Sequence, residues 1–471
     1  MSPASARSAA LAQPAVEPPV NRGMRDLDRS KFTQTLNVLA ARVPASRTTQ
    51  FLKHDAKDFV LRMRGIGAVT QDPEPEYRRV LLRTGDKAQF PPQLEEVLER
   101  HEAQLVDESV SFEYDYWTSD QVLQAILPED LLDESPTAFT QVGHIAHLNL
   151  RDQYLPHKHL IGQVILDKNK SLRTVVNKLD SIDNVYRNFQ MEVLAGEPDF
   201  VVEMAEHDCR FKFDFSKVYW NSRLQTEHAR LVDSFDSQDV VCDAFAGVGP
   251  FAIPAGKKGC GVMASDLNPA SAEALAENAK LNKVESTVRT ANADARDFIR
   301  SSVLAVWENP FPEYVAPLSN KERNRRNREA RGLATSTPST TTTTTTAPPA
   351  PPQPETRKAE RKVINHFVMN LPASAIEFLD AYRGLYRDLY AKYGDVAREE
   401  VKRVGLPIVH CYCFTKDIEG AEKDICERAT RALGFEVHPQ LEDYNLRFVR
   451  DVAPKKEMYC LEFRLTEEMT I

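Results

Sequence analysis

Several features that would narrow the protein class are missing from this sequence. No apolar run is long enough to cross a lipid bilayer, so a membrane-spanning helix is not expected. The seven cysteines include no Cys-x-x-Cys pair, which favours buried thiols in a reducing compartment over disulfides or a zinc site. The formal net charge of −9 gives no basic signature. A basic groove can nevertheless lie on an acidic molecule, so nucleic acid stays open as a partner.

The amino terminus is almost free of acidic residues. Within residues 1–25, Glu17 is the only acid among alanines, serines and arginines. This composition fits either a disordered tail or a mitochondrial transit peptide. Prolines at 14, 18 and 19 interrupt a long amphipathic helix and favour the tail. We assign residues 1–26 to such a segment. Cytoplasm, nucleus and mitochondrial matrix all stay open as compartments.

A chain of 471 residues is too long for one hydrophobic core and predicts two or three domains. Residues 27–140 predict a small α+β domain, with helices at 32–39 and 92–100 and strands at 59–64 and 78–83. Residues 141–222 predict a β-rich middle domain, with strands at 142–150, 161–166, 200–204 and 209–215.

From residue 223 to 471 the pattern alternates between strand and helix. Strands are predicted at 239–243, 260–265, 286–291, 363–369, 406–414 and near 446–463. Helices are predicted at 250–257, 269–282, 372–392 and 417–432. Such alternation predicts an α/β, Rossmann-like domain with a doubly wound, mostly parallel sheet. A basic and then Thr/Pro-rich tract at 312–361 interrupts it and is predicted to be a disordered insertion.

A glycine loop follows the first strand of this region, in the segment Asp243-Ala-Phe-Ala-Gly-Val-Gly-Pro-Phe. Gly247 and Gly249 would let the backbone turn sharply and approach a ligand with no Cβ in the way. The helix that begins near Pro250 would offer unpaired N–H groups to the ligand. Alone, the loop could be a structural turn, and it also fits the relaxed dinucleotide pattern.

Further polar residues follow the later strands. Asp266 comes about 20 residues after the loop, where an acid that binds ribose hydroxyls belongs in a nucleotide fold. Asp294 follows the third strand, where it could meet a base edge or simply cap a helix. Asp243 before the loop and the Asn370-Leu-Pro372 motif favour S-adenosylmethionine over a nicotinamide cofactor.

Longer segments resemble the eukaryotic and archaeal tRNA (guanine-37-N1)-methyltransferases. The resemblance runs from about residue 141 to 466 apart from the insertion, whereas residues 27–130 match only loosely. Its strongest segments are 186–197, 218–228, 243–254 and 367–372, extended by 406–412 and 445–459. It implies a class I methyltransferase that uses S-adenosylmethionine to methylate N1 of the guanine just 3′ of the tRNA anticodon.

The resemblance also implies roles for individual residues. Glu227 matches the general base, and Arg187 matches an essential arginine near the guanine. Tyr219, Arg223 and Pro372 match positions on the substrate side. The cofactor set implied by the resemblance and by the glycine loop is His228, Asp243, Gly247, Gly249, Asp266, Leu267, Asp294, Ala295 and Asn370. One departure lies in Asn221-Ser222-Arg223, where the family pattern usually has proline before the arginine.

The chemistry of guanine N1 explains these residue types. N1 carries a proton and is a poor nucleophile until a base removes it, which moves negative charge onto O6. Glu227 would be the base, Arg187 the stabilising charge, and Asn370 a hydrogen-bonding group for the base or cofactor. No metal is required. An alternative for Arg223 and Glu227 is an ion pair, because residues four apart share one face of a helix.

The expected partner is tRNA, contacted at its anticodon loop and its folded body, with the protein acting as a monomer. Candidate phosphate contacts are Lys158, Lys168, Lys170 and Arg173. Two other functions stay open from the sequence. The protein could methylate another RNA or a protein amide, or it could be an RNA-binding protein without catalytic activity.

Overall fold

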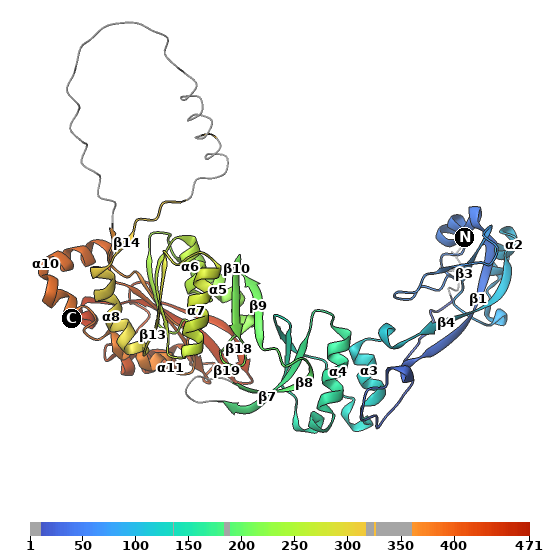
Figure 1. Cartoon of the computed structure of the whole chain (residues 1–471), viewed down its shortest axis with the longest axis horizontal. Coiled ribbons are helices and arrows are strands. Elements are labelled where there is room, and N and C mark those ends of the chain that lie inside the picture. Colours follow the sequence, from blue (N-terminus) through green and yellow to red (C-terminus); the bar gives the residue numbers. More distant parts are fainter. Residues whose placement is uncertain (1–10, 135, 183–188, 317–324, 326–359) are drawn as a thin grey trace, which may run out of the picture. The chain divides into compact units, whose positions relative to one another are not determined.

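The computed structural model describes residues 11–134, 136–182, 189–316, 325 and 360–471, with side chains omitted at 180–182 and 189. The chain forms two compact units (Figure 1). Unit 1 contains Met1–Leu179 and Met191–Asp199, and unit 2 contains Asp180–Gln190 and Phe200–Ile471. The change of unit near residue 199 lies within the region predicted as a single middle domain, 141–222.

Unit 1 begins with a four-stranded antiparallel sheet in the order β2-β3-β1-β4. Its strands are β1 (Gln34–Pro44), β2 (Val69–Gln71), β3 (Tyr77–Leu81) and β4 (Gln104–Phe112). The predicted helix at 32–39 is therefore wrong. Strand β1 is central and buries Val38 and Ala40 in one core and Ala41 and Val43 in another. Apolar residues on both faces hide the two-residue period of a strand.

The other predictions for this region have mixed outcomes. Helix α2 (Pro92–Arg100) is confirmed, and it buries Leu94, Val97 and Leu98 on one face. Of the predicted strand at 59–64, only an isolated bridge between Val60 and Leu82 forms. Short turns of 3-10, α or π helix complete this part: Arg29–Phe32, Ala45–Arg47, Thr48–Gln50, Phe51–Asp55, Lys87–Gln89, Tyr114–Tyr116 and Glu129–Leu131.

A second sheet in unit 1 has the order β5-β6-β7-β8. It consists of β5 (Thr140–Val142), β6 (Ile145–Leu148), β7 (Thr174–Ile182) and β8 (Phe189–Gly196), with helices α3 (Ser119–Ile126), α4 (Lys158–Lys168) and the 3-10 segment Asp152–His157. The predicted strand at 161–166 is wrong because this run belongs to α4. Its buried residues Leu160, Ile161, Val164 and Ile165 follow helical spacing. A short apolar run fits both periods, and packing decides between them.

The described part of the amino-terminal segment lies along unit 1. The backbone N–H of Asn21 donates to the Ala125 carbonyl at 2.8 Å, and Arg22 Nη1 donates to the Leu127 carbonyl at 2.8 Å. The disordered segment predicted for residues 1–26 is therefore wrong for residues 11–26. Residues 1–10 lie outside the described part.

Unit 2 opens with a hairpin of β9 (Val201–Glu206) and β10 (Cys209–Asp214), as predicted at 200–204 and 209–215. Side-chain amides of helix α7 (Pro269–Leu281) cover its edge. Asn278 Oδ1 accepts from the Lys212 N–H, and Asn282 Oδ1 just beyond the helix accepts from the Arg210 N–H, both at 2.8 Å. These bonds satisfy backbone groups that an edge strand would otherwise leave open.

The main sheet of unit 2 has seven strands in the order β13-β12-β11-β16-β17-β19-β18. Pairing is parallel from β13 to β17 and antiparallel for β19 and β18. This confirms the predicted doubly wound α/β fold. The strands are β11 (Val240–Asp243), β12 (Gly261–Asp266), β13 (Val288–Asn292), β16 (His366–Met369), β17 (Ile408–Thr415), β18 (Asn445–Ala453) and β19 (Lys456–Arg464).

Helices pack on both faces of this sheet (Figure 1). They are α5 (Gln225–Ser234), α6 (Ala252–Lys258), α7, α8 (Ala295–Glu308), η9 (Ala375–Tyr382), α10 (Arg387–Val404), α11 (Ala421–Leu433) and α12 (Glu467–Thr470). The single helix predicted at 372–392 is wrong. The chain breaks between η9 and α10, where Gly384 has a φ of 67° that a right-handed helix cannot contain.

The insertion leaves and rejoins unit 2 at one place. Its ends form a short antiparallel pair, β14 (Phe311–Pro312) with β15 (Glu360–Arg361). Arg361 strengthens the closure, since its Nε donates to the Pro312 carbonyl at 2.8 Å. Most of the predicted insertion, 312–361, lies outside the described residues. Among the helices that are described, none combines the length and apolar character needed to span a bilayer.

We expect the core of unit 2 to be sensitive to truncation at Phe367. This side chain is fully buried on β16 and meets the Tyr382 ring edge-to-face, with centroids 5.1 Å apart. Phe367→Ala should lower the free energy of unfolding by about 3–5 kcal/mol in a denaturant titration. Phe448→Ala is the matched control, because Phe448 is exposed and also meets a tyrosine ring edge-to-face, that of the half-buried Tyr459 at 5.7 Å. Its cost should stay below about 1.5 kcal/mol. Equal losses would contradict this prediction.

Candidate active site

The strand order of the main sheet reverses between β11 and β16. In open α/β sheets, ligands bind beyond the carboxyl ends of the strands at such a reversal. Asp243 is the last residue of β11, and Asn370 follows the last residue of β16. The register pairs Asp243 with Val368, two residues before Asn370. The fold therefore brings these two predicted site residues to one place.

The glycine loop turns at this point. Gly247 and Gly249 have φ values of 54° and 99°, in the region that favours glycine. A Cβ on Gly249 would lie 2.6 Å from Ile253 Cγ1 and 2.7 Å from Leu275 Cδ1, so close packing requires glycine there. A Cβ on Gly247 would meet nothing within 4 Å. The space beside Gly247 is therefore open.

Asp266 braces the glycine loop from the end of β12. Its carboxylate accepts the Gly247 N–H at 2.8 Å through one oxygen and the Asn268 N–H at 2.9 Å through the other. Burial raises the pKa of Asp266, although both hydrogen bonds act against this rise. The residue predicted to bind ribose hydroxyls therefore lies against the loop and fixes its conformation.

Asp243 is fully buried and incompletely paired. Oδ1 accepts a long hydrogen bond of 3.3 Å from the Phe245 N–H, and Oδ2 has no partner among the described residues. Burial raises the pKa of Asp243 to about 8, with a smaller contribution from the charge of Asp266. A buried acceptor without a donor is costly and suits a ligand that brings one.

Asn370 has the same property as Asp243. Its Oδ1 is buried and has no partner in the described part of the chain. Two residues on, the Pro372 carbonyl accepts the Phe414 N–H at 2.9 Å, which ties the motif to the end of β17. S-adenosylmethionine carries ammonium, hydroxyl and amino donors, so its chemistry fits the unpaired acceptors on Asp243 and Asn370.

The remaining predicted cofactor positions, Leu267, Asp294 and Ala295, follow the ends of β12 and β13. Asn292 Nδ2 donates to the carbonyls of Asp266 at 2.7 Å and Leu267 at 3.0 Å. The Leu267 side chain is half exposed. Asp294 caps α8 by accepting the Arg296 N–H at 2.9 Å, and Ala295 is the buried first residue of that helix.

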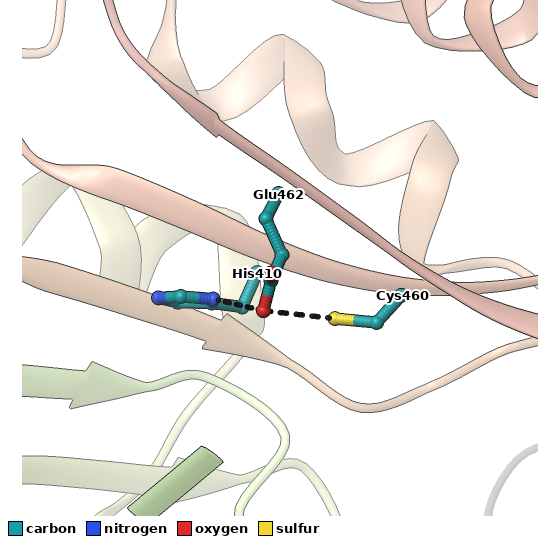
Figure 2. Close-up of side chains that lie close together, drawn as sticks. All are labelled: His410, Cys460 and Glu462. Atoms are coloured by element: carbon teal, nitrogen blue, oxygen red, sulfur yellow. Dashed lines mark hydrogen bonds and ion pairs between the residues drawn. The ribbon is translucent and has the colours of Figure 1, made fainter. Parts of the chain in front are cut away.

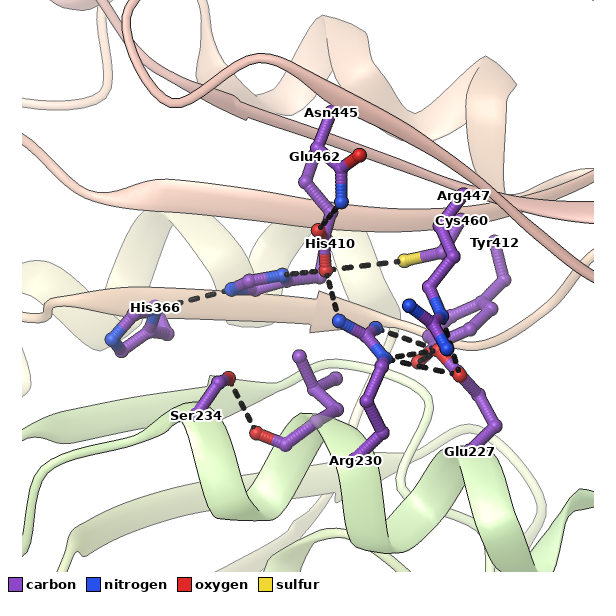
Figure 3. Close-up of polar contacts among 11 residues, drawn as sticks. Glu227, Arg230, Ser234, His366, His410, Tyr412, Asn445, Arg447, Cys460 and Glu462 are labelled. Carbon is purple, nitrogen blue, oxygen red and sulfur yellow. Dashed lines mark hydrogen bonds and ion pairs between the residues drawn. The ribbon is translucent and has the colours of Figure 1, made fainter.

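Glu227 lies on α5 and is buried at 7% exposure. Arg230, one helical turn later, donates hydrogen bonds to both carboxylate oxygens, with Nε 3.1 Å from Oε1 and 3.0 Å from Oε2 (Figure 3). The Tyr412 hydroxyl donates to Oε1 at 2.9 Å. Arg447 Nε lies 3.6 Å from Oε2. These contacts come from α5, β17 and β18, so the predicted general base has a fixed orientation.

The other substrate-side predictions are more exposed. Tyr219 is half exposed, and Arg223 is exposed in the 3-10 turn Ser222–Leu224. Asn221 caps that turn by accepting the Arg223 N–H at 3.2 Å, so the turn forms with Ser222 in place of the proline that is usual before the arginine. Within the described residues, the ion-pair partners of Glu227 are Arg230 and Arg447. The proposed pair with Arg223 was wrong.

His228 and Arg187 have different outcomes. His228 is buried beside Glu227 on α5, where its Nδ1 lies 2.7 Å from Glu206 Oε1. Its ring meets the Phe251 ring edge-to-face at 4.8 Å, next to the glycine loop. Arg187 lies outside the described residues.

Three residues around Glu227 were missed from the sequence: Arg230, Tyr412 and Arg447. The three-residue spacing of Glu227 and Arg230 was a usable signal, because such residues also share a helix face. Tyr412 and Arg447 are 185 and 220 positions away in the chain, and only the sheet register brings them near.

A family model described as the TRM5/TYW2 methyltransferase domain matches residues 202–306, and one described as the TYW2 N-terminal domain matches residues 119–199. Over 463 residues the chain is 47% identical to the tRNA (guanine(37)-N(1))-methyltransferase of Coprinopsis cinerea, and the match covers 96% of each chain. This protein belongs to the tRNA (guanine(37)-N(1))-methyltransferase family.

A second relative supports the membership. The corresponding enzyme of Cryptococcus neoformans var. neoformans is 43% identical over all of this chain and 91% of its own length. Among solved structures, the complex of aTrm5 and tRNALeu superposes with a TM-score of 0.58 at 20% identity, covering 91% of this chain and 100% of that one. Trm5b from Pyrococcus abyssi superposes at 0.53 and 21% identity, covering 91% and 99%. At these identities the structures support the fold alone.

The buried Asp243 carboxyl makes the stability of the ligand-free protein depend on pH. Its folded-state pKa lies above the unfolded value near 4, so the native state holds this proton more tightly. The stability contributed by this group is fully present below about pH 4 and is lost as pH rises towards 8. Asp243→Asn cannot ionise and lacks this dependence.

We therefore expect the difference in Tm, wild type minus Asp243→Asn, to fall between about pH 6 and pH 8.5 in thermal unfolding of ligand-free protein. Asp214→Asn is a control in which the pKa shift of the replaced carboxyl has the opposite sign. Hydrogen bonds with Ser216 and Lys217 outweigh burial and lower the pKa of Asp214. A constant or rising difference for Asp243→Asn would show that its carboxyl is ionised when buried.

Proposed function

We propose that this protein methylates N1 of guanine 37 in tRNA with S-adenosylmethionine as methyl donor, and that Glu227 is its general base. The observation that carries the proposal is 47% identity to a tRNA (guanine(37)-N(1))-methyltransferase over 96% of both chains. Because a fold alone does not imply a function, the proposal also depends on the residues proposed for catalysis, Glu227, Arg187 and Asn370.

The cofactor site proposed here lies at the carboxyl ends of β11, β12 and β16. S-adenosylmethionine, when bound, supplies an electrophilic methyl group on its sulfonium. Gly247 and Gly249 let the backbone approach it, and Asp266, Leu267, Asp294 and Ala295 are proposed to line the nucleoside side. The unpaired oxygens of Asp243 and Asn370 support hydrogen bonds to the ligand's donors.

The proposed chemistry begins with proton removal at N1. Glu227 accepts this proton, and its position is set by the two-pronged contact with Arg230 and the hydroxyl of Tyr412. Loss of the proton increases negative charge on O6, which Arg187 is proposed to stabilise. The remaining work of the protein is to hold the nucleophile and the methyl carbon in line at a short distance.

The substrate side is proposed to use Tyr219, Arg223 and Pro372. The half-exposed ring of Tyr219 offers a surface on which an unstacked base could lie. Extruding guanine 37 from the anticodon loop costs a few kcal/mol, so further contacts to the anticodon loop and the folded tRNA body are proposed to repay this cost. We propose that the protein acts as a monomer.

Four basic residues of unit 1 were candidate phosphate contacts. Lys158 pairs with Glu192 at 2.7 Å, Arg173 pairs with Asp199 at 2.8 Å, and Lys168 lies over the Tyr114 ring. Lys170 is exposed. The existing pairings reduce the charge that Lys158 and Arg173 would bring to phosphate.

Methyl transfer to tRNA transcripts tests the proposed reaction. We expect label from S-adenosylmethionine to appear in a transcript with guanine at position 37 and not in one with adenine there. A methyl group on N1 blocks the Watson–Crick edge, so reverse transcription should stop beside position 37. Modification at another nucleotide, or of protein only, would overturn the substrate assignment.

Replacing the proposed base gives a second prediction. Glu227→Gln keeps the size of the side chain but cannot accept the N1 proton. We expect kcat to fall by ~10²–10⁴, with tRNA and S-adenosylmethionine binding retained. The measurement is single-turnover methylation together with equilibrium binding.

The matched control is Glu400→Gln, since Glu400 is also a helical glutamate held by an arginine three residues later. Its rate should equal that of wild type. A Glu227→Gln protein that methylates at the wild-type rate would remove Glu227 as the base.

A further inference from the structure

Three neighbouring strands present a set of polar residues towards helix α5. In the antiparallel register, Glu462 of β19 pairs with His410 of β17 on one side and with Asn445 of β18 on the other. Two residues along, Cys460 likewise pairs with Tyr412 and Arg447. Because side chains alternate along a strand, these six residues share one face of the sheet. Glu227 and Arg230 of α5 face them (Figure 3).

Glu462 is the centre of this polar face. It is 8% exposed, and its Oε1 lies 3.0 Å from His410 Nδ1 and 3.8 Å from Cys460 Sγ (Figure 2). The same oxygen accepts from Arg230 Nη1 at 3.0 Å, and Oε2 accepts from Asn445 Nδ2 at 2.7 Å. Protein donors thus satisfy both oxygens of Glu462, and the Arg230 guanidinium supplies the positive charge beside them.

Arg230 therefore bridges two buried carboxylates. Its Nε and Nη2 contact Glu227, whereas its Nη1 contacts Glu462. The planar guanidinium has donors in a fixed fork, so holding one end constrains the other. Hydrogen bonding to Glu227 and the charge of Glu462 outweigh burial and raise the pKa of Arg230. The cation is present at every working pH.

The network continues away from Glu227. His410 Nε2 lies 3.0 Å from His366 Nδ1, and His366 Nε2 lies 3.2 Å from Asp239 Oδ2. An arginine stands between Glu462 and Glu227 and does not give up its proton in proteins. This excludes a proton relay from Glu227 to Asp239. The side chains around Glu462 therefore act on Glu227 by orienting it and through their charge, and not by passing a proton.

Glu462 is ionised in this environment. Burial alone would raise its pKa, but hydrogen bonds from His410 and Asn445 and the charge of Arg230 bring the pKa of Glu462 down to about 2. Burial lowers the pKa of His410. Glu227 and Glu462 thus share the cation of Arg230.

We propose that Glu462 is a positioning residue for methyl transfer. By accepting from Nη1 of Arg230, Glu462 fixes the guanidinium in its two-pronged contact with Glu227. The charge of Glu462 also offsets the charge of Arg230, so that Glu227 can still take the N1 proton. This inference rests on the proposed function, in which Glu227 is the base. Without the charge of Glu462, Arg230 would act on Glu227 alone and make it a weaker base.

The groups that face the two carboxylates define the pH dependence. They are Arg230 from α5, His366 from β16, His410 and Tyr412 from β17, Asn445 and Arg447 from β18, and Cys460 from β19. Burial raises the pKa values of Tyr412 and Cys460, so both stay neutral at working pH. Removing the charge of Glu462 therefore affects Glu227 mainly through Arg230.

The first test is Glu462→Gln in the full chain, assayed by single-turnover methylation of a guanine-37 transcript over a range of pH. We expect kcat to fall on the order of tenfold. The acidic limb of the kcat profile should move to lower pH by on the order of one unit, with KM for tRNA unchanged. Glutamine keeps an oxygen for Arg230 and His410, and the Asn445 amide can turn to accept from its nitrogen.

A second variant should move the acidic limb of the kcat profile in the opposite direction. This test does not require the Glu462→Gln protein to fold. Asn445 is exposed on the edge strand, so Asn445→Asp replaces the amide that donates to Glu462 with a carboxylate that solvent can still reach. We expect the acidic limb to move to higher pH. Glu400→Gln, which changes a carboxylate paired with Arg403 on α10, should leave the profile unchanged.

The outcomes separate this inference from the proposed function. If Glu227→Gln is inactive but Glu462→Gln and Asn445→Asp both keep the wild-type profile, only the role of Glu462 is overturned. The same conclusion follows if Glu462→Gln changes stability or KM but not the position of the acidic limb. If Glu227→Gln is fully active, the base assignment itself is wrong.

Discussion

The parallel pairing of β11 with β16 is the constraint on which the candidate site depends. It places Asp243 opposite Val368 and therefore brings the glycine loop and the Asn370 motif to the same edge of the sheet. These segments are more than a hundred residues apart, with the insertion between them. Because β14 and β15 close the insertion at its base, the chain can carry it without disturbing this pairing.

The proposed site contains two kinds of buried carboxyl. On the cofactor side, Asp243 has one unpaired oxygen, and burial raises its pKa. On the base side, Glu227 and Glu462 are surrounded by donors and share Arg230. An unpaired buried acceptor is costly until a ligand supplies a donor, whereas a fully paired one is rigid. This difference fits the proposed roles, in which Asp243 binds the cofactor and Glu227 is the general base.

Much of unit 2 followed from the sequence because its strands and helices alternate with clear boundaries. The failures have physical causes. The run at 161–166 is apolar enough for a strand or a helix, and packing made it helix α4. Strand β1 is buried on both faces, which hid its period. At 372–392 the apolar pattern continues through a break that Gly384 makes with a positive φ.

The sequence by itself determined the order of the motifs, the glycines of the cofactor loop and the Glu227 and Asn370 positions, since each lies in a short contiguous segment. Tertiary structure alone decided that Glu227 pairs with Arg230 and that Arg230 in turn pairs with Glu462. Arg230 was one helical turn away, but Tyr412, Arg447 and Glu462 reach it only through the register of β17, β18 and β19. Such contacts join residues about 200 positions apart, and no local pattern encodes a strand register at that separation.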